Sequence, residues 1–511
     1  MDNSNIAVSM RNITKTFGSV KANSHVDLSV YKGEILSLLG ENGSGKTTLM
    51  NMLSGIYHPD EGDIFINGEK VNITSPKDAF NLGIGMVHQH FKLVDVLDAT
   101  ENIILGEKGK LNLKKAKEKI NEICSRYGFD LDTDKKIYNM SVSEKQTVEI
   151  VKVLYRGASI LILDEPTAVL TPQETEKLFN VMRNMKKDGK SIIIITHKLN
   201  EVKEISDRVA ILRSGEYIGD LKTSESTPQQ MTDMMVGRAV VLNIERPEVK
   251  NPKLRIKVNG LNIKDADGID KIKNVSFDMF GGEILGVAGI SGCGQKELLE
   301  SIAGLQPIES GSVKYFDDEG NEKELIGMNP RDIQELGVAL SFVPEDRLGM
   351  GLVGSMDISD NMMLRSFREG RGVFTDRKTP LNTAENIVEK LDVKTPNLET
   401  PVSRLSGGNV QKVLVGREIS NEPKVLMTAY AVRGLDINSS YAIYDLINEQ
   451  KKNGVAVLFV GEDLDVLLQI SDRILVLCDG CVSGILDGRT ADKNTVGLMM
   501  TSLEGGKNDA N

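Results

Sequence analysis

The sequence predicts two consecutive α/β domains, each built on a mixed, mainly parallel β-sheet. The chain has 511 residues, which is too long for one hydrophobic core. Short β-branched runs such as ILILD (Ile160–Asp164) and SIIIIT (191–196) alternate with helical patterns, as buried parallel strands do. The first half of the chain also returns in the second half, so both halves are expected to fold alike.

The internal repeat sets the domain boundaries. The segment that begins VDLSVYKGEILSLLG at Val26 returns as VSFDMFGGEILGVAG at Val275, an offset of 249 residues. The offset becomes 265 between SDRVAIL (206–212) and SDRILVL (471–477), so about sixteen residues are inserted in the second copy. This period is far longer than that of a solenoid repeat and indicates domain duplication. We expect domains at 1–240 and 256–503, a proline-containing linker at 241–255 and a disordered polar tail at 504–511.

Composition excludes several classes of protein. The formal net charge of -11 argues against general affinity for nucleic acid, because binding to phosphate backbones needs clustered Lys and Arg. The sequence contains no apolar run near the roughly 18 residues that span a bilayer, so a cytoplasmic chain is expected. Four cysteines are too few and too scattered for a disulfide framework. Cys478 and Cys481 form one CxxC, which fits a strand entering a turn better than a zinc or redox site.

The first half contains a phosphate-binding loop, which is called the cradle below. GENGSGKTT fits the pattern G-x-x-x-x-G-K-[ST], follows the strand-like EILSLL and leads into the helical TLMNMLSG. In such a loop backbone amides surround the phosphates, while Lys46 neutralises the β- and γ-phosphates and the Thr47 hydroxyl ligates Mg²⁺. The predicted ligands are therefore ATP and Mg²⁺, and the predicted contacts are Gly40, Glu41, Asn42, Gly43, Ser44, Gly45, Lys46, Thr47 and Thr48.

Two strands deliver polar side chains to the same sheet edge. ILILDEPT ends in Asp164 and Glu165, and SIIIITHK places His197 at the equivalent position. Ligands bind at the carboxyl edge of such sheets. Asp164 suits the Mg²⁺ shell, Glu165 suits polarising the attacking water, and His197 suits stabilising the γ-phosphate. The alternative for the carboxylates is an acidic pair on the surface.

With these motifs the first half resembles an ABC transporter ATPase domain, and the whole chain resembles the tandem ATPase subunit of simple-sugar and nucleoside importers. The resemblance implies that each domain has a helical subdomain bearing a signature motif. It also implies that Phe17 stacks on adenine and that Gln89, the Q-loop residue, contacts Mg²⁺ and water. An aromatic residue near a first strand can equally belong to the core, which is the alternative for Phe17.

The two halves differ in the family's motifs. The signature is intact in the second half as LSGGN, with Ser406, Gly407, Gly408 and Asn409, but the first half has MSVSE (140–144). There side chains replace both glycines and should obstruct a phosphate. In the repeat register, the second half carries other residues at the predicted catalytic and metal positions of the first: Gln295 for Lys46, Lys296 for Thr47, Glu345 for Gln89, Ala429 for Asp164, Tyr430 for Glu165 and Glu462 for His197.

The resemblance further implies that such domains pair head to tail, so that each nucleotide lies between one cradle and the other domain's signature. One composite site would then join the complete first cradle to Ser406, Gly407, Gly408, Asn409 and the D-loop residue Asp436. The other would join the altered cradle to MSVSE and Thr171. One hydrolytic site is expected, and neither domain should work alone.

The resemblance implies partners as well. Transmembrane permease subunits would dock near the Q-loops, hold the chain at the cytoplasmic face of the membrane as its sole membrane association, and receive solute from an extracellular binding lipoprotein. The stretch VHQHFKLV (87–94) resembles the nucleoside-importing branch more than the sugar-importing one. Two alternatives remain: a soluble tandem ABC protein acting on ribosomes or nucleic acid, and a nucleotide-regulated scaffold without useful turnover.

Overall fold

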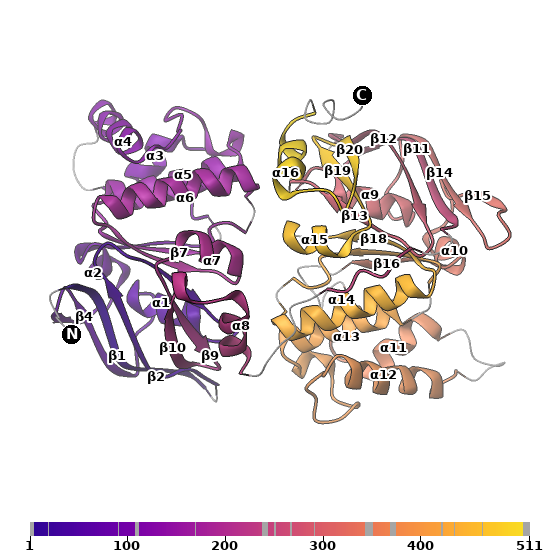
Figure 1. Ribbon diagram of the computed structural model, residues 1–511, viewed down its shortest axis with the longest axis horizontal. Helices are drawn as coiled ribbons and strands as arrows, with labels where there is room; N and C mark the ends of the chain where they lie inside the picture. The colour runs from indigo at the N-terminus through magenta and orange to yellow at the C-terminus, as the bar shows by residue number, and fades with distance from the viewer. Residues whose placement is uncertain are drawn as a thin grey trace. The chain divides into compact units, whose positions relative to one another are not determined.

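The chain forms two compact units, Met1–Val241 and Leu242–Asn511, called unit 1 and unit 2 below. Figure 1 shows both as layered α/β structures. The computed structural model describes residues 5–503 apart from 19, 90, 108–111, 169, 238–243, 250–251, 266–267, 291, 343–350, 368–374, 421–422, 434 and 462. The tail predicted at 504–511 lies outside the described residues.

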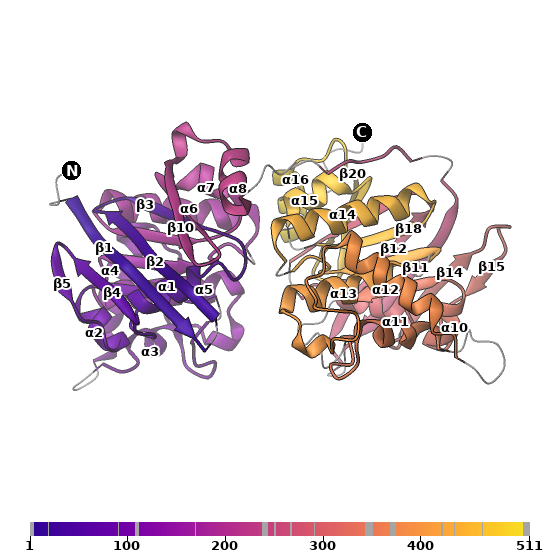
Figure 2. The ribbon, with the colours of Figure 1, turned by 90° about the horizontal axis from the view of Figure 1, so that it is seen from below.

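Unit 1 contains two sheets. A four-stranded antiparallel sheet has the order β2-β1-β4-β5 and faces the viewer in Figure 2. A six-stranded sheet has the order β10-β9-β3-β8-β7-β6, in which only the β9–β10 pair is antiparallel. The strands are β1 (Ile6–Phe17), β2 (Val20–Tyr31), β3 (Ile35–Leu39), β4 (Glu61–Ile66), β5 (Glu69–Val71), β6 (Ile84–Val87), β7 (Ile160–Asp164), β8 (Ser191–Ile195), β9 (Arg208–Arg213) and β10 (Glu216–Lys222).

The helices of unit 1 cover these sheets and form a subdomain. The larger sheet is buried on both faces. One face forms a core with α1 and the antiparallel sheet, and the other face forms a core with α5 and α6. A separate core joins α3, α4 and α5. The helices are α1 (Lys46–Leu53), α2 (Pro76–Asn81), α3 (Ala99–Ile104), α4 (Leu113–Tyr127), α5 (Val142–Tyr155), α6 (Pro172–Lys187), α7 (Leu199–Ile205) and α8 (Pro228–Val236).

Unit 2 repeats this architecture. Its sheets run β12-β11-β14-β15 and β20-β19-β13-β18-β17-β16, the same orders strand for strand. The strands are β11 (Leu254–Lys264), β12 (Asp270–Phe280), β13 (Ile284–Ala288), β14 (Ser310–Phe316), β15 (Glu322–Glu324), β16 (Val338–Phe342), β17 (Val425–Ala429), β18 (Ala456–Val460), β19 (Arg473–Cys478) and β20 (Cys481–Asp487). The helices are α9 (Gln295–Ile302), α10 (Pro330–Glu335), α11 (Ile358–Ser366), α12 (Lys378–Lys390), α13 (Gly407–Ile419), α14 (Ile437–Lys452), α15 (Leu464–Ile470) and α16 (Lys493–Thr501).

The predicted fold class is confirmed, with one feature added. Parallel strands such as β7 and β8 are buried at every residue, which explains their unbroken apolar runs. The antiparallel sheet of each unit is separate from the parallel one, and the sequence did not distinguish it. Cys478 ends β19 and pairs in register with Cys481 of β20, so the two cysteines flank a two-residue hairpin turn. Both are free cysteines.

The segment expected as a linker contacts unit 2. Ile244 is 6% exposed and lies in the unit 2 core. The Glu245 carbonyl accepts from Asn448 Nδ2 at 2.5 Å, and Arg246 Nη1 donates to the Ser471 carbonyl at 2.7 Å. Ile244, Glu245 and Arg246 are therefore packed against unit 2, and regular structure resumes at β11.

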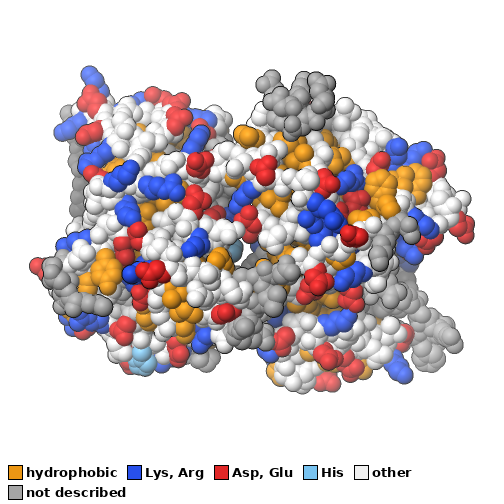
Figure 3. All heavy atoms as spheres, in the orientation of Figure 1, with side chains coloured by type: hydrophobic (Ala, Val, Ile, Leu, Met, Phe, Trp, Pro, Cys, Tyr) orange, Lys and Arg blue, Asp and Glu red, His pale blue; other side chains and the backbone are white. Residues whose placement is uncertain are grey.

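On the face shown in Figure 3, basic and acidic side chains are interspersed over both units. Among the helices that the structure describes, none has the length and apolar character to cross a bilayer.

Candidate active site

The phosphate-binding loop of unit 1 joins the central strand β3 to α1. Gly43 and Gly45 have φ of 82° and 93°, in the left-handed region where glycine avoids the cost of a Cβ. A Cβ on Gly45 would also lie 2.3 Å from the Ala22 carbonyl oxygen. The buried Asn23 side chain donates to the Gly45 carbonyl at 3.3 Å. The β1–β2 hairpin therefore holds the loop against α1.

Lys46 lies inside this loop. Its side chain is buried, and Nζ donates to the carbonyls of Gly40 and Glu41 at 2.7 and 2.9 Å. Burial lowers the pKa of Lys46, while Glu165, Asp164 and Glu41 raise it in opposition. A desolvated cation among backbone carbonyls and amides is suited to neutralising a phosphate group.

The structure brings the predicted catalytic groups of β7 and β8 to one edge. Thr47 Oγ1 lies 3.5 Å from Asp164 Oδ2, and His197 Nδ1 lies 2.9 Å from Glu165 Oε1. Glu165 has φ of 49° and its side chain is 14% exposed, whereas the His197 side chain is 57% exposed. The histidine therefore fixes the orientation of a largely buried carboxylate.

The donor set fits a hard divalent cation. Burial, helped by the charge of Glu165, raises the pKa of Asp164 to about 6, against the effects of Lys46 and Thr47. A carboxylate and a threonine hydroxyl so placed are the oxygen ligands that Mg²⁺ takes. Bound Mg²⁺ would supply charge neutralisation for the phosphates.

Phe17 and Gln89 occupy exposed positions. Phe17 ends β1 and is 43% exposed, so the alternative of a core residue is wrong. Its ring meets that of Tyr57 edge to face, with centroids 5.2 Å apart. Gln89 is exposed and follows β6, the strand beside β7. Sequence reasoning missed Tyr57, whose only signal is that Gln306 replaces it in the repeat.

The signature positions begin equivalent helices with different caps. In unit 2, Ser406 caps α13, and Asn409 Nδ2 donates to Ser406 Oγ at 2.8 Å. In unit 1, Ser141 caps α5, and the Glu144 carboxylate accepts from Ser141 N at 2.7 Å. The altered signature thus places a carboxylate at a helix N-terminus, where it competes with a phosphate for positive potential. Asp436 caps α14, accepting from Ser439 N at 2.8 Å.

The cradle of unit 2 keeps the backbone and changes the chemistry. Gly292 and Gly294 have φ of 87° and 101°, close to the values in unit 1. Inside the loop, Gln295 is buried, and Cys293 Sγ lies 3.6 Å from Gln295 Oε1. Tyr430 keeps a positive φ of 58° at the place of Glu165. Ala429 ends β17 and is buried, and Lys296 Nζ lies 3.7 Å from Glu300 Oε1. The remaining two predicted replacements, Glu345 and Glu462, lie outside the described residues.

Comparisons with known proteins cover nearly the whole chain. A family model described as ABC transporter matches residues 23–168 and 272–428. The nucleoside import ATP-binding protein NupA of Lactococcus lactis is 43% identical over 96% of this chain and 97% of that protein. The glucose import ATP-binding protein TsgD13 of Haloferax volcanii is 39% identical over 96% of this chain and 95% of that protein.

One solved structure is similar over most of the chain. It contains the archaeal ribosome recycling factor aABCE1 in complex with the ribosomal stalk protein aP1. The match has a TM-score of 0.61 and 16% identity and covers 93% of this chain and 90% of that one. At this identity the similarity concerns the fold alone.

Proposed function

The chain belongs to the ABC transporter family, whose cassettes are ATPases, and we propose that it powers an importer through one hydrolytic site per chain. The observation that carries the proposal is the set Lys46, Thr47, Asp164, Glu165 and His197 at one sheet edge of unit 1. Unit 2 keeps the same frame without these groups.

We infer that the site is completed by Ser406, Gly407, Gly408, Asn409 and Asp436 when the two cassettes pair. The losses support pairing, because the chain has altered the cradle of one unit and the signature of the other. Glu165, held by His197, would orient the attacking water, and Lys46 would neutralise charge on the transferred phosphate. Thr47, Asp164 and Gln89 would hold Mg²⁺.

ATPase measurements on the full chain test the assignment. Glu165→Gln should lower kcat by about 10² to 10⁴ and leave ATP binding intact, because only the orientation of water is lost. Gln295→Ala, in the altered cradle, is the matched control and should change kcat less than about twofold. Activity indifferent to Glu165, or abolished by the Gln295 change, would show that the sites are assigned wrongly. Activity indifferent to Glu165 would also favour the alternative of a nucleotide-regulated scaffold.

We propose nucleosides as the cargo class, ahead of simple sugars. The support is the higher identity to a nucleoside import protein than to a glucose import protein, together with the stretch 87–94. Cells lacking the chain should lose uptake of labelled guanosine and adenosine and retain uptake of ribose and glucose. The converse pattern would assign sugars, and recovery of the chain with ribosomes and not with membranes would favour the ribosomal alternative.

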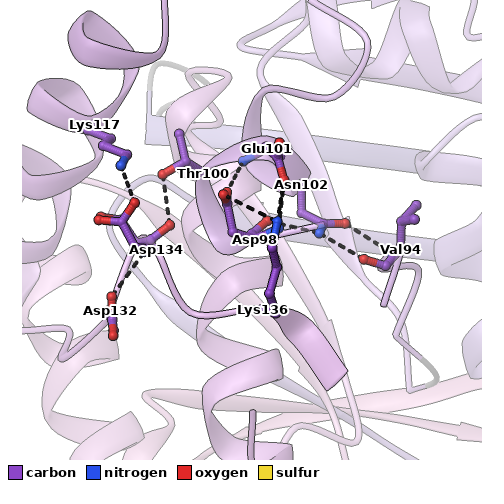
Figure 4. A network of polar contacts seen from close by, with 10 residues as sticks. Val94, Asp98, Thr100, Glu101, Asn102, Lys117, Asp132, Asp134 and Lys136 are labelled. Atoms are coloured by element: carbon purple, nitrogen blue, oxygen red, sulfur yellow. Dashed lines mark hydrogen bonds and ion pairs between the residues drawn. The ribbon is translucent and has the colours of Figure 1, made fainter. Parts of the chain in front are cut away.

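A permease docking surface follows Gln89 in unit 1. Val94, Val96 and Tyr138 are 40%, 70% and 61% exposed, and Tyr138 N donates to the Asp95 carbonyl at 3.2 Å. The backbone at Val94 is held by the Asn102 side chain (Figure 4). Asn102 Oδ1 accepts a hydrogen bond from Val94 N at 2.8 Å, and Asn102 Nδ2 donates one to the Val94 carbonyl at 3.1 Å. We infer that this docking surface (Val94, Val96, Tyr138) meets the permease, since the resemblance puts permeases near the Q-loop.

Co-purification with the permease subunits tests this surface. Val96→Asp should abolish recovery of the complex and leave the ATPase activity of the isolated chain unchanged. Leu113→Asp, at a residue of α4 that is 48% exposed, is the control and should leave the complex intact. Equal recovery of both variants would place the permease elsewhere.

A further inference from the structure

Two aromatic rings from separate segments of unit 1 meet. Phe17 ends β1, and Tyr57 lies in the loop between α1 and β4. The rings are 43% and 38% exposed, and their planes meet at 69° with centroids 5.2 Å apart. Tyr57 therefore covers part of the Phe17 ring and leaves the remainder accessible to solvent.

An ion pair restrains the same ring from another direction. Lys15 Nζ lies 5.5 Å from the Phe17 ring centroid, over one of its faces, and 2.7 Å from Asp60 Oδ1. Asp60 Oδ2 also accepts from Thr16 N at 2.7 Å. With the cation over one face and Tyr57 against the ring, the part of Phe17 that stays exposed is the part on which a planar ligand can stack.

Both rings are attached to the elements that form the phosphate-binding loop. The β1–β2 hairpin, which ends β1 at Phe17, contacts Gly45 through Asn23. Tyr57 N donates to the carbonyl of Asn51 in α1, the helix that begins at Lys46. The ring pair and the phosphate loop are thus held in one frame.

The repeat in unit 2 keeps this frame and lacks both rings. Lys264 pairs with Glu309 at 3.5 Å, joining the same two segments. By strand register Asp265 follows Lys264 where Phe17 follows Thr16. Gln306 replaces Tyr57 and donates to the Lys264 carbonyl at 2.8 Å. Both rings are absent in the unit that also lacks the cradle lysine and threonine.

We propose that Tyr57 is a positioning residue for the purine base of the bound nucleotide: it fixes the Phe17 ring in the plane on which the base stacks. The proposal rests on the proposed function, in which Phe17 contacts adenine. Tyr57 acts through its ring and not through its hydroxyl. It should therefore matter for nucleotides and not for a triphosphate that has no base.

The test uses the full chain and compares ATP with inorganic tripolyphosphate as a competitive inhibitor. Tyr57→Ala should raise KM for ATP about three- to tenfold, which corresponds to the free energy of one edge-to-face aromatic pair. Both kcat and the inhibition constant of tripolyphosphate should stay unchanged. Tyr57→Phe should restore the KM of the unaltered chain. Ile56→Ala, in the same loop and 43% exposed, is the matched control.

A double variant separates the proposal from its premise. Phe17→Ala combined with Tyr57→Ala should raise KM no further than Phe17→Ala alone, because Tyr57 acts through Phe17. If Phe17→Ala leaves KM for ATP unchanged, the adenine contact and the role of Tyr57 are both wrong. If Phe17→Ala raises KM for ATP and Tyr57→Ala does not, only the positioning role is wrong. The same conclusion follows if Tyr57→Ala weakens the binding of ATP and of tripolyphosphate equally.

Discussion

Lys46 and Gln295 occupy the same place in two loops of the same shape, yet their chemistry differs. The left-handed glycines are retained in both units, and the positive φ of Glu165 recurs at Tyr430. The backbone therefore does not depend on the side chains that are proposed to be catalytic. Single side chains distinguish the two cradles, which is why the difference is visible in sequence.

Cys293 offers a chemical probe of the altered cradle. Burial raises the pKa of Cys293 to about 12, and its Sγ contacts the Leu477 carbonyl oxygen at 3.6 Å. Only the thiolate reacts with iodoacetamide, so the labelling rate of Cys293 should be very low at pH 8 and rise about tenfold per unit of pH to pH 10 and beyond. Mass spectrometry of the alkylated peptides measures this rate.

Cys124 and the unfolded chain provide the comparison. Burial also raises the pKa of Cys124, to about 11, so it should label slowly as well. In urea all four cysteines should label at similar rates. Rapid labelling of Cys293 in the folded chain would mean that the cradle of unit 2 is open and not packed as described.

Sequence reasoning placed the motif residues better than their neighbours. Asp164 ends one strand, Glu165 follows it and His197 follows the adjacent strand, so strand alternation and the rule of the carboxyl edge brought them together correctly. Tyr57 belongs to no period or motif, because a ring in a loop acquires meaning only from what it touches. Its contact with Phe17 required the fold.

At the scale of elements, α5 and α13 show one capping position with two uses. Ser141 and Ser406 both occupy the N-cap. In α5 the capping box with Glu144 satisfies the free amides within the chain, whereas in α13 the neutral Asn409 leaves the N-terminus without a competing carboxylate. The first cap is structural, and the second is proposed to be catalytic.

Paired serine variants distinguish these uses. Ser141→Ala should lower the free energy of unfolding by about 1 kcal/mol through loss of a helix cap and leave ATPase activity unchanged. Ser406→Ala should cost a similar stability and lower kcat/KM at least tenfold, because its hydroxyl is proposed to contact the γ-phosphate. Urea denaturation and steady-state kinetics measure both effects. Identical kinetics for the two variants would refute the assignment of the signature.

A second repeated device fixes the loop that precedes the helical subdomain. Asn102 bonds both backbone groups of Val94, and Asn361 does the same for Val353 in unit 2. Both side chains are fully buried. Asn102→Ala should therefore cost about 2 kcal/mol of unfolding free energy, because it removes the hydrogen bonds to both backbone groups of Val94.

Asn361→Ala is the matched control for that loss. It should destabilise unit 2 by about the same amount, as measured by urea denaturation. A cost below about 0.5 kcal/mol in either unit would show that solvent replaces the amide, and the loop would then not be fixed as inferred.

At the scale of the whole molecule, the duplication was readable from sequence, and the packing of Ile244 against unit 2 was not. The offset of the repeat located two units, since it needs only matching residues. The segment 241–255 looked like a linker because prolines and charges dominate it. Ile244 is one of several apolar residues there, and they follow no periodicity, so its burial in the unit 2 core could not be inferred.

Fragments of unit 2 test the role of this segment. A fragment 244–503 should be more stable to urea than a fragment 254–503 by about 2 to 4 kcal/mol, since the shorter one exposes the site of Ile244 and loses the bonds of Glu245 and Arg246. Ile244→Ala in the longer fragment should account for much of this difference. Equal stability of the two fragments would return the segment to the status of a linker.

The same fragments test whether function requires both units. Fragment 5–237 holds the complete cradle and should bind ATP, but it should hydrolyse ATP at a small fraction of the rate of the full chain, because it carries MSVSE in place of a signature. Adding fragment 244–503 should restore turnover in a concentration-dependent way, and the Ser406→Ala form of that fragment should not. Full activity of fragment 5–237 by itself would refute the shared site. The duplicated fold would then hold one working ATPase and a second unit with another purpose.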